Sequence, residues 1–527
     1  MRLLPAALIL AAALPASAAR SDDRPLDTRL YIEGVESIRK GNRVEGAKLL
    51  RRVFTEFPDS RHAAAALLRV ADLIYPVRDW NGVGSASAAA VRKAAPLLER
   101  LADRYRSSRE APRALVRLGY LALEPANPAA GLEAACARFS DSARLYPDSD
   151  VAADASCGPA WCAALRARPE RAADFFSRLL DEHPGSPLAA EALYRKGMAL
   201  SRLDDPAEAM LTLQRLRATH PGSEPAARAL DAITLIHRMR ILPSLRRAAA
   251  GSRAPDGADG TRLFRYDAEY GAAVSSGDNG ARRIRGSSDI VIDPHGRAVV
   301  ASRRSPGVFR LDRRGAIRDR IDHPGPEFLA VGKGPAVYIS GRRQIAVNTT
   351  NWSGAELKGS GGRSVGDFGP IALDPSGRVY LLDTSENAVL VYDQRRRLVG
   401  TLRPPPGRGG RFVDLAMGED GAVYVLGARP ATVAALHQGR PTSHVSLAVL
   451  GLAAPAALAV DALGDLFILD GKTGWVFVAD PGGRRLAVVR PPEEATRRLG
   501  RASALAVDGR GRIYLCGRKT GQVVRFR

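Results

Sequence analysis

Two patterns of apolar residues divide the chain. In the first part, turns that contain proline and serine are each followed by a ladder of small apolar residues, whose spacing is typical of closely packed helices. In the second part, short runs such as 379–382 alternate with Asp-x-x-Gly turns, which is typical of β-strands. We therefore predict a helical domain at 27–245, a Gly- and Pro-containing linker at 246–260 and an all-β domain at 261–527.

The helical part repeats one turn. Its serines, at intervals of 48, 41, 37 and 37 residues, are Ser60, Ser108, Ser149, Ser186 and Ser223. In three copies alanines follow three, four and six residues after the serine. Proline ends one helix and serine caps the next, while Asp205 and Pro206 open a partner helix. Each unit is thus predicted to be two antiparallel helices that stack on their neighbours.

The β part repeats an apolar segment that ends in Asp-x-x-Gly. Its six copies, 39 to 47 residues apart, are centred on Asp293, Gly332, Asp374, Gly418, Asp461 and Asp508. The aspartate accepts local N–H groups and the glycine takes a positive φ, so each copy predicts a tight hairpin. Four short strands per copy form a propeller blade. Because the last blade ends after its third strand, we expect residues 263–267 to supply the fourth and close the ring.

Both repeats resemble known families. The turns with alanine ladders resemble tetratricopeptide repeats, in a form similar to periplasmic proteins of the Tol-Pal-associated and outer-membrane-barrel-assembly families. Residues 371–380 resemble the NHL repeat, whose members form six-bladed propellers. The resemblance implies a multidomain α + β chain, in which an all-α tetratricopeptide-like solenoid of helical hairpins precedes an all-β six-bladed NHL-like propeller.

The first nineteen residues predict export. Arg2, an apolar run at 3–14 and the small residues at 16–19 form the signature of a secretory signal peptide. We expect the mature chain to be soluble, periplasmic or otherwise extracytoplasmic, and not integral to the membrane.

Export makes a disulfide feasible. In an oxidising compartment Cys136 is expected to pair with Cys157 or Cys162, and buried free thiols are the alternative.

Positive charge is concentrated in the β part. The chain has 78 Lys and Arg against 56 Asp and Glu, which gives a net charge of +22. Residues 261–527 contain 40 of these basic residues and 25 of the acidic ones. Because chain reversals alternate between the two ends of a blade, the loops between second and third strands and those between blades share one face. The cations that we predict there are Arg303, Arg304, Arg342, Arg343, Arg408, Arg411, Arg429, Lys472, Arg518 and Lys519. Solvated arginines in a GC-rich protein are the alternative.

A cationic face of this kind suggests acidic partners. We expect envelope proteins, or else anionic lipid, lipopolysaccharide or acidic glycan. Nucleic acid is not expected, because an exported protein rarely meets RNA and no aromatic residues interleave with the basic loops.

The sequence contains no catalytic motif. Gly-x-Ser-x-Gly, His-Glu-x-x-His, phosphate-binding loops and Cys-x-x-Cys are missing. The repeated aspartates are interpreted as turn residues, and His295 and His323 are expected outside the central channel. We therefore predict no catalytic residue, metal ligand or cofactor, and a non-enzymatic cell-envelope scaffold or adaptor that binds protein partners. The alternative, by analogy with NHL-like enzymes, is a metal-dependent hydrolase or lyase with a helical docking domain.

Overall fold

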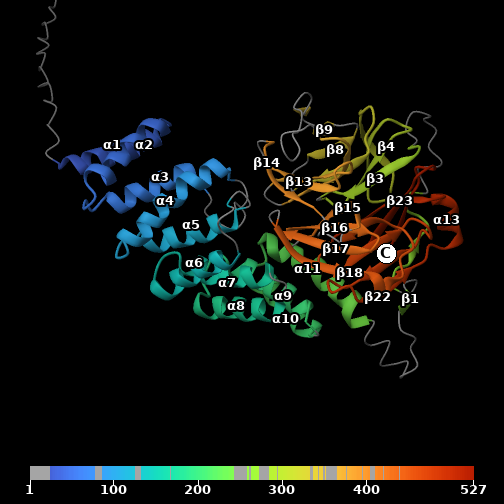
Figure 1. Cartoon of the computed structure of the whole chain (residues 1–527). Coiled ribbons are helices and arrows are strands. Elements are labelled where there is room, and N and C mark those ends of the chain that lie inside the picture. Colours follow the sequence, from blue (N-terminus) through green and yellow to red (C-terminus); the bar gives the residue numbers. More distant parts are fainter. Residues whose placement is uncertain are drawn as a thin grey trace, which may run out of the picture.

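The computed structural model of the chain consists of a layer of helical hairpins beside a β-propeller (Figure 1). The residues that the structure describes are 24–527 without 77–85, 125–126, 128–131, 166–167, 204, 243–257, 260–262, 272–283, 294, 333–335, 342–343, 348–349, 352–364, 375–376, 394–395, 404–409, 419–420 and 438–439. The predicted signal peptide, 1–19, lies outside them. Within the described residues, no helix is long and apolar enough to cross a membrane.

Eleven α-helices follow one another in the described residues of the helical part, and each packs against the next. They are α1 (Leu26–Arg39), α2 (Arg43–Glu56), α3 (Ala63–Ile74), α4 (Ala88–Arg104), α5 (Ala111–Leu123), α6 (Leu132–Leu145), α7 (Ala152–Leu165), α8 (Pro169–Glu182), α9 (Ala189–Ser201), α10 (Pro206–Thr219) and α11 (Glu224–Ile236), which continues into the π-helical turn η2 (His237–Ile241). The prediction of stacked helical hairpins is confirmed.

The predicted serine caps occur at one turn and are displaced at two others. Ser223 is the N-cap of α11 and accepts the N–H of Ala226 at 3.3 Å, and Asp205 caps α10 in the same way. Ser60 and Ser186 instead accept the N–H two residues on, and their helices begin three residues after the serine. The prediction that Ser60 and Ser186 cap their helices directly is therefore wrong. Each hydroxyl group instead stabilises a separate turn that precedes the helix.

Six antiparallel sheets form the blades of the propeller, as the repeat predicts. Blades 1 to 3 are β3 (Ser287–Ile292), β4 (Ala298–Ser302), β5 (Gly307–Leu311) and β6 (Ile317–Ile321); β7 (Phe328–Val331), β8 (Val337–Gly341), β9 (Gln344–Val347) and β10 (Thr350–Asn351); and β11 (Phe368–Leu373), β12 (Val379–Asp383), β13 (Ala388–Tyr392) and β14 (Leu398–Leu402). Blades 4 to 6 are β15 (Arg411–Met417), β16 (Ala422–Ala428), β17 (Thr432–His437) and β18 (Arg440–Ser446); β19 (Pro455–Val460), β20 (Leu466–Asp470), β21 (Val476–Ala479) and β22 (Arg485–Val489); and, after helix α13 (Glu493–Leu499), β23 (Ala502–Val507), β24 (Ile513–Gly517) and β25 (Val523–Phe526). The first strands of successive blades contact one another around the centre of the ring.

The last blade is closed by a strand from the start of the domain. Strand β2 (Tyr266–Asp267) pairs antiparallel with β25 and completes a four-stranded sheet, which confirms the predicted closure. Its Asp267 is buried and accepts a hydrogen bond from the Arg525 Nε at 2.8 Å. Of the predicted linker 246–260, the structure describes β1 (Ala258–Asp259), which adds a parallel fifth strand to blade 5.

The repeated aspartates close the turns between first and second strands. At Asp293, Asp374 and Asp508, one carboxylate oxygen accepts the N–H of the residue four positions on, and the other accepts the Nε of that residue's arginine side chain at 2.6–2.7 Å. Asp461 closes the same turn in blade 5, but its fourth residue is Asp465. The interpretation of these aspartates as turn residues is confirmed.

The helical part docks on the face of the ring that carries these turns. Arg240, in η2, donates two hydrogen bonds to the buried Asp465 carboxylate, at 2.7 and 2.9 Å. Asp465 stands where the turns of blades 1, 3 and 6 carry an arginine, and in blade 5 the guanidinium group of Arg240 pairs with Asp465 and not with the turn aspartate Asp461. Arg238 donates to the carbonyl groups of Arg510 and Gly511 in the corresponding turn of blade 6, both at 3.1 Å.

A hydrophobic core also crosses this boundary. One cluster of buried side chains joins Leu235, Ile236 and Met239 of the helical part to Leu463, Phe467 and Ile513 of blades 5 and 6. The helices and the propeller are therefore held together by shared buried surface.

Candidate functional site

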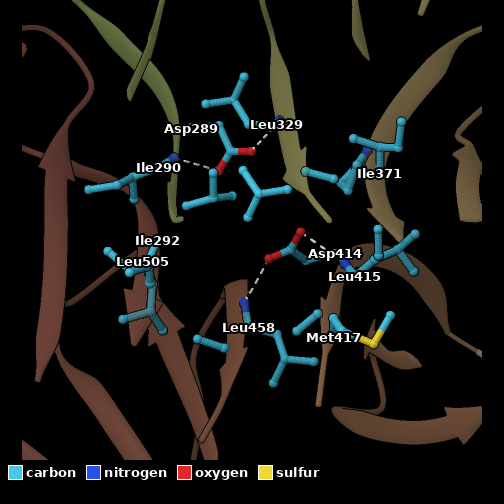
Figure 2. Close-up of a pocket in the computed structure, with 18 of the residues that line it drawn as sticks. Asp289, Ile290, Ile292, Leu329, Ile371, Asp414, Leu415, Met417, Leu458 and Leu505 are labelled. Carbon is cyan, nitrogen blue, oxygen red and sulfur yellow. Dashed lines mark hydrogen bonds between the residues drawn. The ribbon is translucent and has the colours of Figure 1, made fainter. Parts of the chain in front are cut away.

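The first strands of the six blades enclose a cavity at the centre of the propeller (Figure 2). Its volume is about 170 Å³, and its described lining consists of apolar residues and two aspartates, Asp289 and Asp414. Both carboxyl groups point into the cavity, from β3 and β15. These strands belong to blades 1 and 4, which lie opposite one another in a ring of six.

Each of these carboxyl groups connects two neighbouring first strands. Asp289 accepts the N–H of the next residue and that of Leu329, on β7, both at 2.8 Å. Asp414 accepts the N–H of the next residue at 2.9 Å and that of Leu458, on β19, at 2.7 Å. Since a carboxylate offers about four acceptor positions, each group keeps capacity for a further partner on the cavity side.

The other four blades have no carboxyl group at this position. The residues that correspond to Asp289 and Asp414 there are Phe328, Pro370, Ala457 and Ala504. A bond from an aspartate to the next blade is therefore no general requirement for closing the ring.

The apolar lining changes the acidity of both groups. Burial raises the pKa of Asp289 to about 6, although two N–H groups oppose the change. Burial and the neighbouring Asp289 carboxylate raise the pKa of Asp414 to about 8. At pH 7 the pair therefore holds one proton and one negative charge. Such a pair can donate a hydrogen bond or a proton from one carboxyl group and accept at the other.

The described side chains of the cavity do not form a catalytic zinc site. They supply two carboxylates and no histidine, whereas catalytic zinc sites use three protein ligands. Among all residues that the structure describes, no group of three or more His, Cys, Asp or Glu side chains is placed to hold a metal ion. His295 lies in the turn after β3, where its N–H bonds Asp293, so it does not complete such a set.

The predicted cations lie at the opposite end of the blades from the helical part. In the turns between second and third strands are Arg303 and Arg304 (blade 1), Arg429 (blade 4), Lys472 (blade 5), and Arg518 and Lys519 (blade 6), all exposed. Arg411, predicted in a loop, is the first residue of β15 and is exposed at the same end. Arg342, Arg343 and Arg408 lie outside the described residues.

Acidic residues neutralise part of this end of the ring. Arg303 forms an ion pair with Glu327 at 2.7 Å, and in blade 3 the corresponding turn holds Glu386, paired with Arg403 at 3.4 Å. Six of the predicted cations are exposed and form no ion pair with any other described residue, and we refer to them as the cationic face: Arg304, Arg411, Arg429, Lys472, Arg518 and Lys519.

Comparison with known proteins bears on the helical part. Residues 191–223 match the tetratricopeptide repeat. The matched segment comprises most of α9 and all of α10, which form one helical hairpin. No curated protein matches the chain.

Several solved structures are similar to about half of the chain. A gluconolactonase from Xanthomonas campestris is 16% identical, with 46% of this chain and 86% of that chain covered and a TM-score of 0.37. Virginiamycin B lyase from Staphylococcus aureus is 11% identical, with 46% and 80% covered and a TM-score of 0.34. The aldose sugar dehydrogenase from Streptomyces coelicolor is 14% identical, with 46% and 94% covered and a TM-score of 0.32. At such identities and scores they do not indicate what this chain does.

The predicted disulfide stays a prediction. Cys136 is half-buried on α6 and Cys157 is buried on the neighbouring helix α7, while the side chain of Cys162 lies outside the described residues.

Sequence reasoning did not identify the acid pair. Asp289 and Asp414 each stand four residues before the turn position of their repeat, where the other copies are apolar. Alignment of the six copies at that position would have shown the two exceptions. The same alignment would have shown Asp465 where blades 1, 3 and 6 carry the turn arginine, but not its partner Arg240.

Proposed function

We propose that the chain is a non-enzymatic scaffold of the cell envelope, exported and then held in the periplasm or another extracytoplasmic space. In this proposal it binds protein partners through its helical repeats and through the cationic face. The observation that carries it is the position of the helical part, which docks on the turn face of the ring and leaves the cationic face exposed.

Two properties support an acidic protein as the partner. The shared core between helices and propeller holds two repeat modules in one fixed arrangement, which suits a platform for other proteins. Although Glu327 and Glu386 neutralise part of this end of the ring, the cations of the cationic face form no ion pair with any described residue, so they favour a surface of opposite charge. Anionic lipid, lipopolysaccharide and acidic glycan share that charge and are separate arms of the test.

The rival proposal is a metal-dependent propeller hydrolase or lyase. It needs a set of metal ligands, and the described lining of the cavity offers two carboxylates. The scaffold is therefore the better-supported function.

Reversing three charges of the cationic face is expected to weaken partner binding. The variant carries Lys472→Glu, Arg518→Glu and Lys519→Glu, and should retain its fold because each exposed change costs within about 0.5 kcal/mol. Binding to proteins of an envelope extract, to anionic vesicles and to lipopolysaccharide would be measured at low and moderate salt. We expect loss of the protein partner, and a smaller difference at higher salt because exposed charges are screened.

The matched control reverses three arginines on the opposite face. It carries Arg313→Glu, Arg314→Glu and Arg396→Glu, and so changes the net charge equally. Equal loss of binding in both variants would mean that net charge alone attracts the partner. If the cationic-face variant still binds the protein partner but no longer binds vesicles or lipopolysaccharide, the face binds an anionic envelope component and not a protein.

A further inference from the structure

The central cavity has a property that does not depend on the scaffold proposal. We propose that it binds a small organic ammonium ion, whose N–H groups hydrogen-bond to both Asp289 and Asp414 and whose apolar part fills the space between the first strands (Figure 2).

The first reason is that no described cation pairs with this half-buried acid pair, although most of the fully buried aspartates have one. Six of the nine buried aspartates form ion pairs with an arginine: Asp267, Asp293, Asp374, Asp393, Asp465 and Asp508. The other three, Asp383, Asp461 and Asp470, accept hydrogen bonds from backbone N–H groups of their turns. The groups that act on Asp289 and Asp414 are backbone N–H groups and the other carboxyl group, with no described arginine or lysine among them. Partial burial of a carboxylate without a cation is unfavourable, and a cation between the two would offset that cost.

The second reason is that a carboxyl group at this position is not part of the repeat. Four of the six blades carry an apolar residue where Asp289 and Asp414 stand. A purely structural role would therefore leave unexplained why two carboxyl groups face each other across an apolar cavity.

The side chains of the cavity suit an organic cation. Apart from the two aspartates, the described lining is Ile, Val, Leu, Ala, Pro and Met, whose side chains can contact the apolar part of such a cation and offer no ligand to a metal ion. A volume of about 170 Å³ is close to that of engineered apolar cavities, about 150 Å³, which bind benzene. A primary ammonium group has three N–H donors, enough to reach both carboxyl groups.

Binding of a cation is linked to the proton on the pair. At pH 7 Asp289 is ionised and Asp414 is protonated, from pKa values of about 6 and about 8. An ammonium ion favours the state in which both are ionised, so its binding expels up to one proton. From all six first strands, the described lining contains no other titratable group, so this proton belongs to the pair.

The probe is benzylamine, and benzyl alcohol is its neutral counterpart. Calorimetric titration of the purified full chain at pH 7, in two buffers of different ionisation enthalpy, gives both affinity and protons released. We expect benzylamine to bind with release of a fraction of a proton, and to bind more tightly at pH 8 than at pH 5. The affinity for benzyl alcohol should be lower than that for benzylamine by about ten-fold or more. Asp289→Asn and Asp414→Asn should each weaken benzylamine about ten-fold or more.

Asp322→Asn is the control, because it removes an exposed carboxylate of the same domain, 85% accessible, and should leave binding unchanged. Equal affinity for amine and alcohol would overturn the proposal, since the cavity would then recognise only apolar shape. Absence of benzylamine binding, or binding without proton release and without pH dependence, would also overturn it. These measurements use the unaltered chain, so they decide the matter even if the aspartate variants fold poorly, and they leave the scaffold proposal untouched.

Discussion

Replacing Arg240 with alanine is expected to lower the free energy of unfolding by about 3–5 kcal/mol. The variant leaves Asp465, whose side chain is 0% exposed, without the bidentate partner that it has among the described residues. Its neighbour Asp461 is itself a carboxyl group and supplies no cation in place of Arg240. Guanidinium-induced unfolding, followed by circular dichroism, measures the loss.

Two further variants separate this buried ion pair from general effects of the boundary. Arg510→Ala removes an ion pair with Asp231 at the same boundary, but both side chains are well exposed, 60% and 39%, so the expected loss is about 0–1 kcal/mol. Adding Asp465→Asn to Arg240→Ala removes the uncompensated charge and should restore part of the stability. A loss for Arg240→Ala no larger than for Arg510→Ala would show that Arg240 does not hold the two parts together.

The acid pair of the cavity is expected to make the chain less stable as pH rises from 5 to 9. A carboxyl group whose folded pKa is raised binds a proton more tightly in the folded state than in the unfolded state. Its favourable contribution is therefore complete below the unfolded pKa, near 4, and is lost as pH rises through the folded values, about 6 for Asp289 and about 8 for Asp414. Asp414→Asn should remove on the order of 4 kcal/mol of this pH dependence.

The variants are to be compared by how steeply the free energy of unfolding changes with pH, and not by its value at one pH. Asparagine replaces one accepting oxygen by an amide group, so Asp414→Asn loses a backbone hydrogen bond at every pH. Unfolding would be measured at several pH values for the wild type, this variant and the exposed control Asp322→Asn. Parallel curves for all three would mean that the cavity does not raise the pKa of Asp414.

What could be predicted from sequence depended on how local the interaction is. The turn at Asp374 lies within five residues, and its repetition sets the period of the blades, so both were predictable. The closing strand at 266–267 was predictable because the repeat itself was one strand short. The serine caps at Ser60 and Ser186 were misplaced because the same local pattern also stabilises a turn before a helix.

The site could not be derived in this way, because it joins distant positions. Asp289 and Asp414 meet only because the ring places blades 1 and 4 opposite one another. Arg240 and Asp465 are 225 positions apart, and nothing within the helical repeats distinguishes Arg240 from the other arginines. The cationic face was expected from the alternation of chain reversals, but its partial neutralisation depends on contacts between blades, such as Arg303 with Glu327.

The closing strand has a consequence for the order in which the protein matures. Strand β2 finds its partner only in β25, with 258 positions between Asp267 and Arg525. The helical hairpins are synthesised first, yet the apolar end formed by Leu235, Ile236 and Met239 is covered by blades that arrive later. A nascent chain therefore exposes a completed helical domain whose apolar end is still uncovered, and this end is prone to aggregation until the last blade is made.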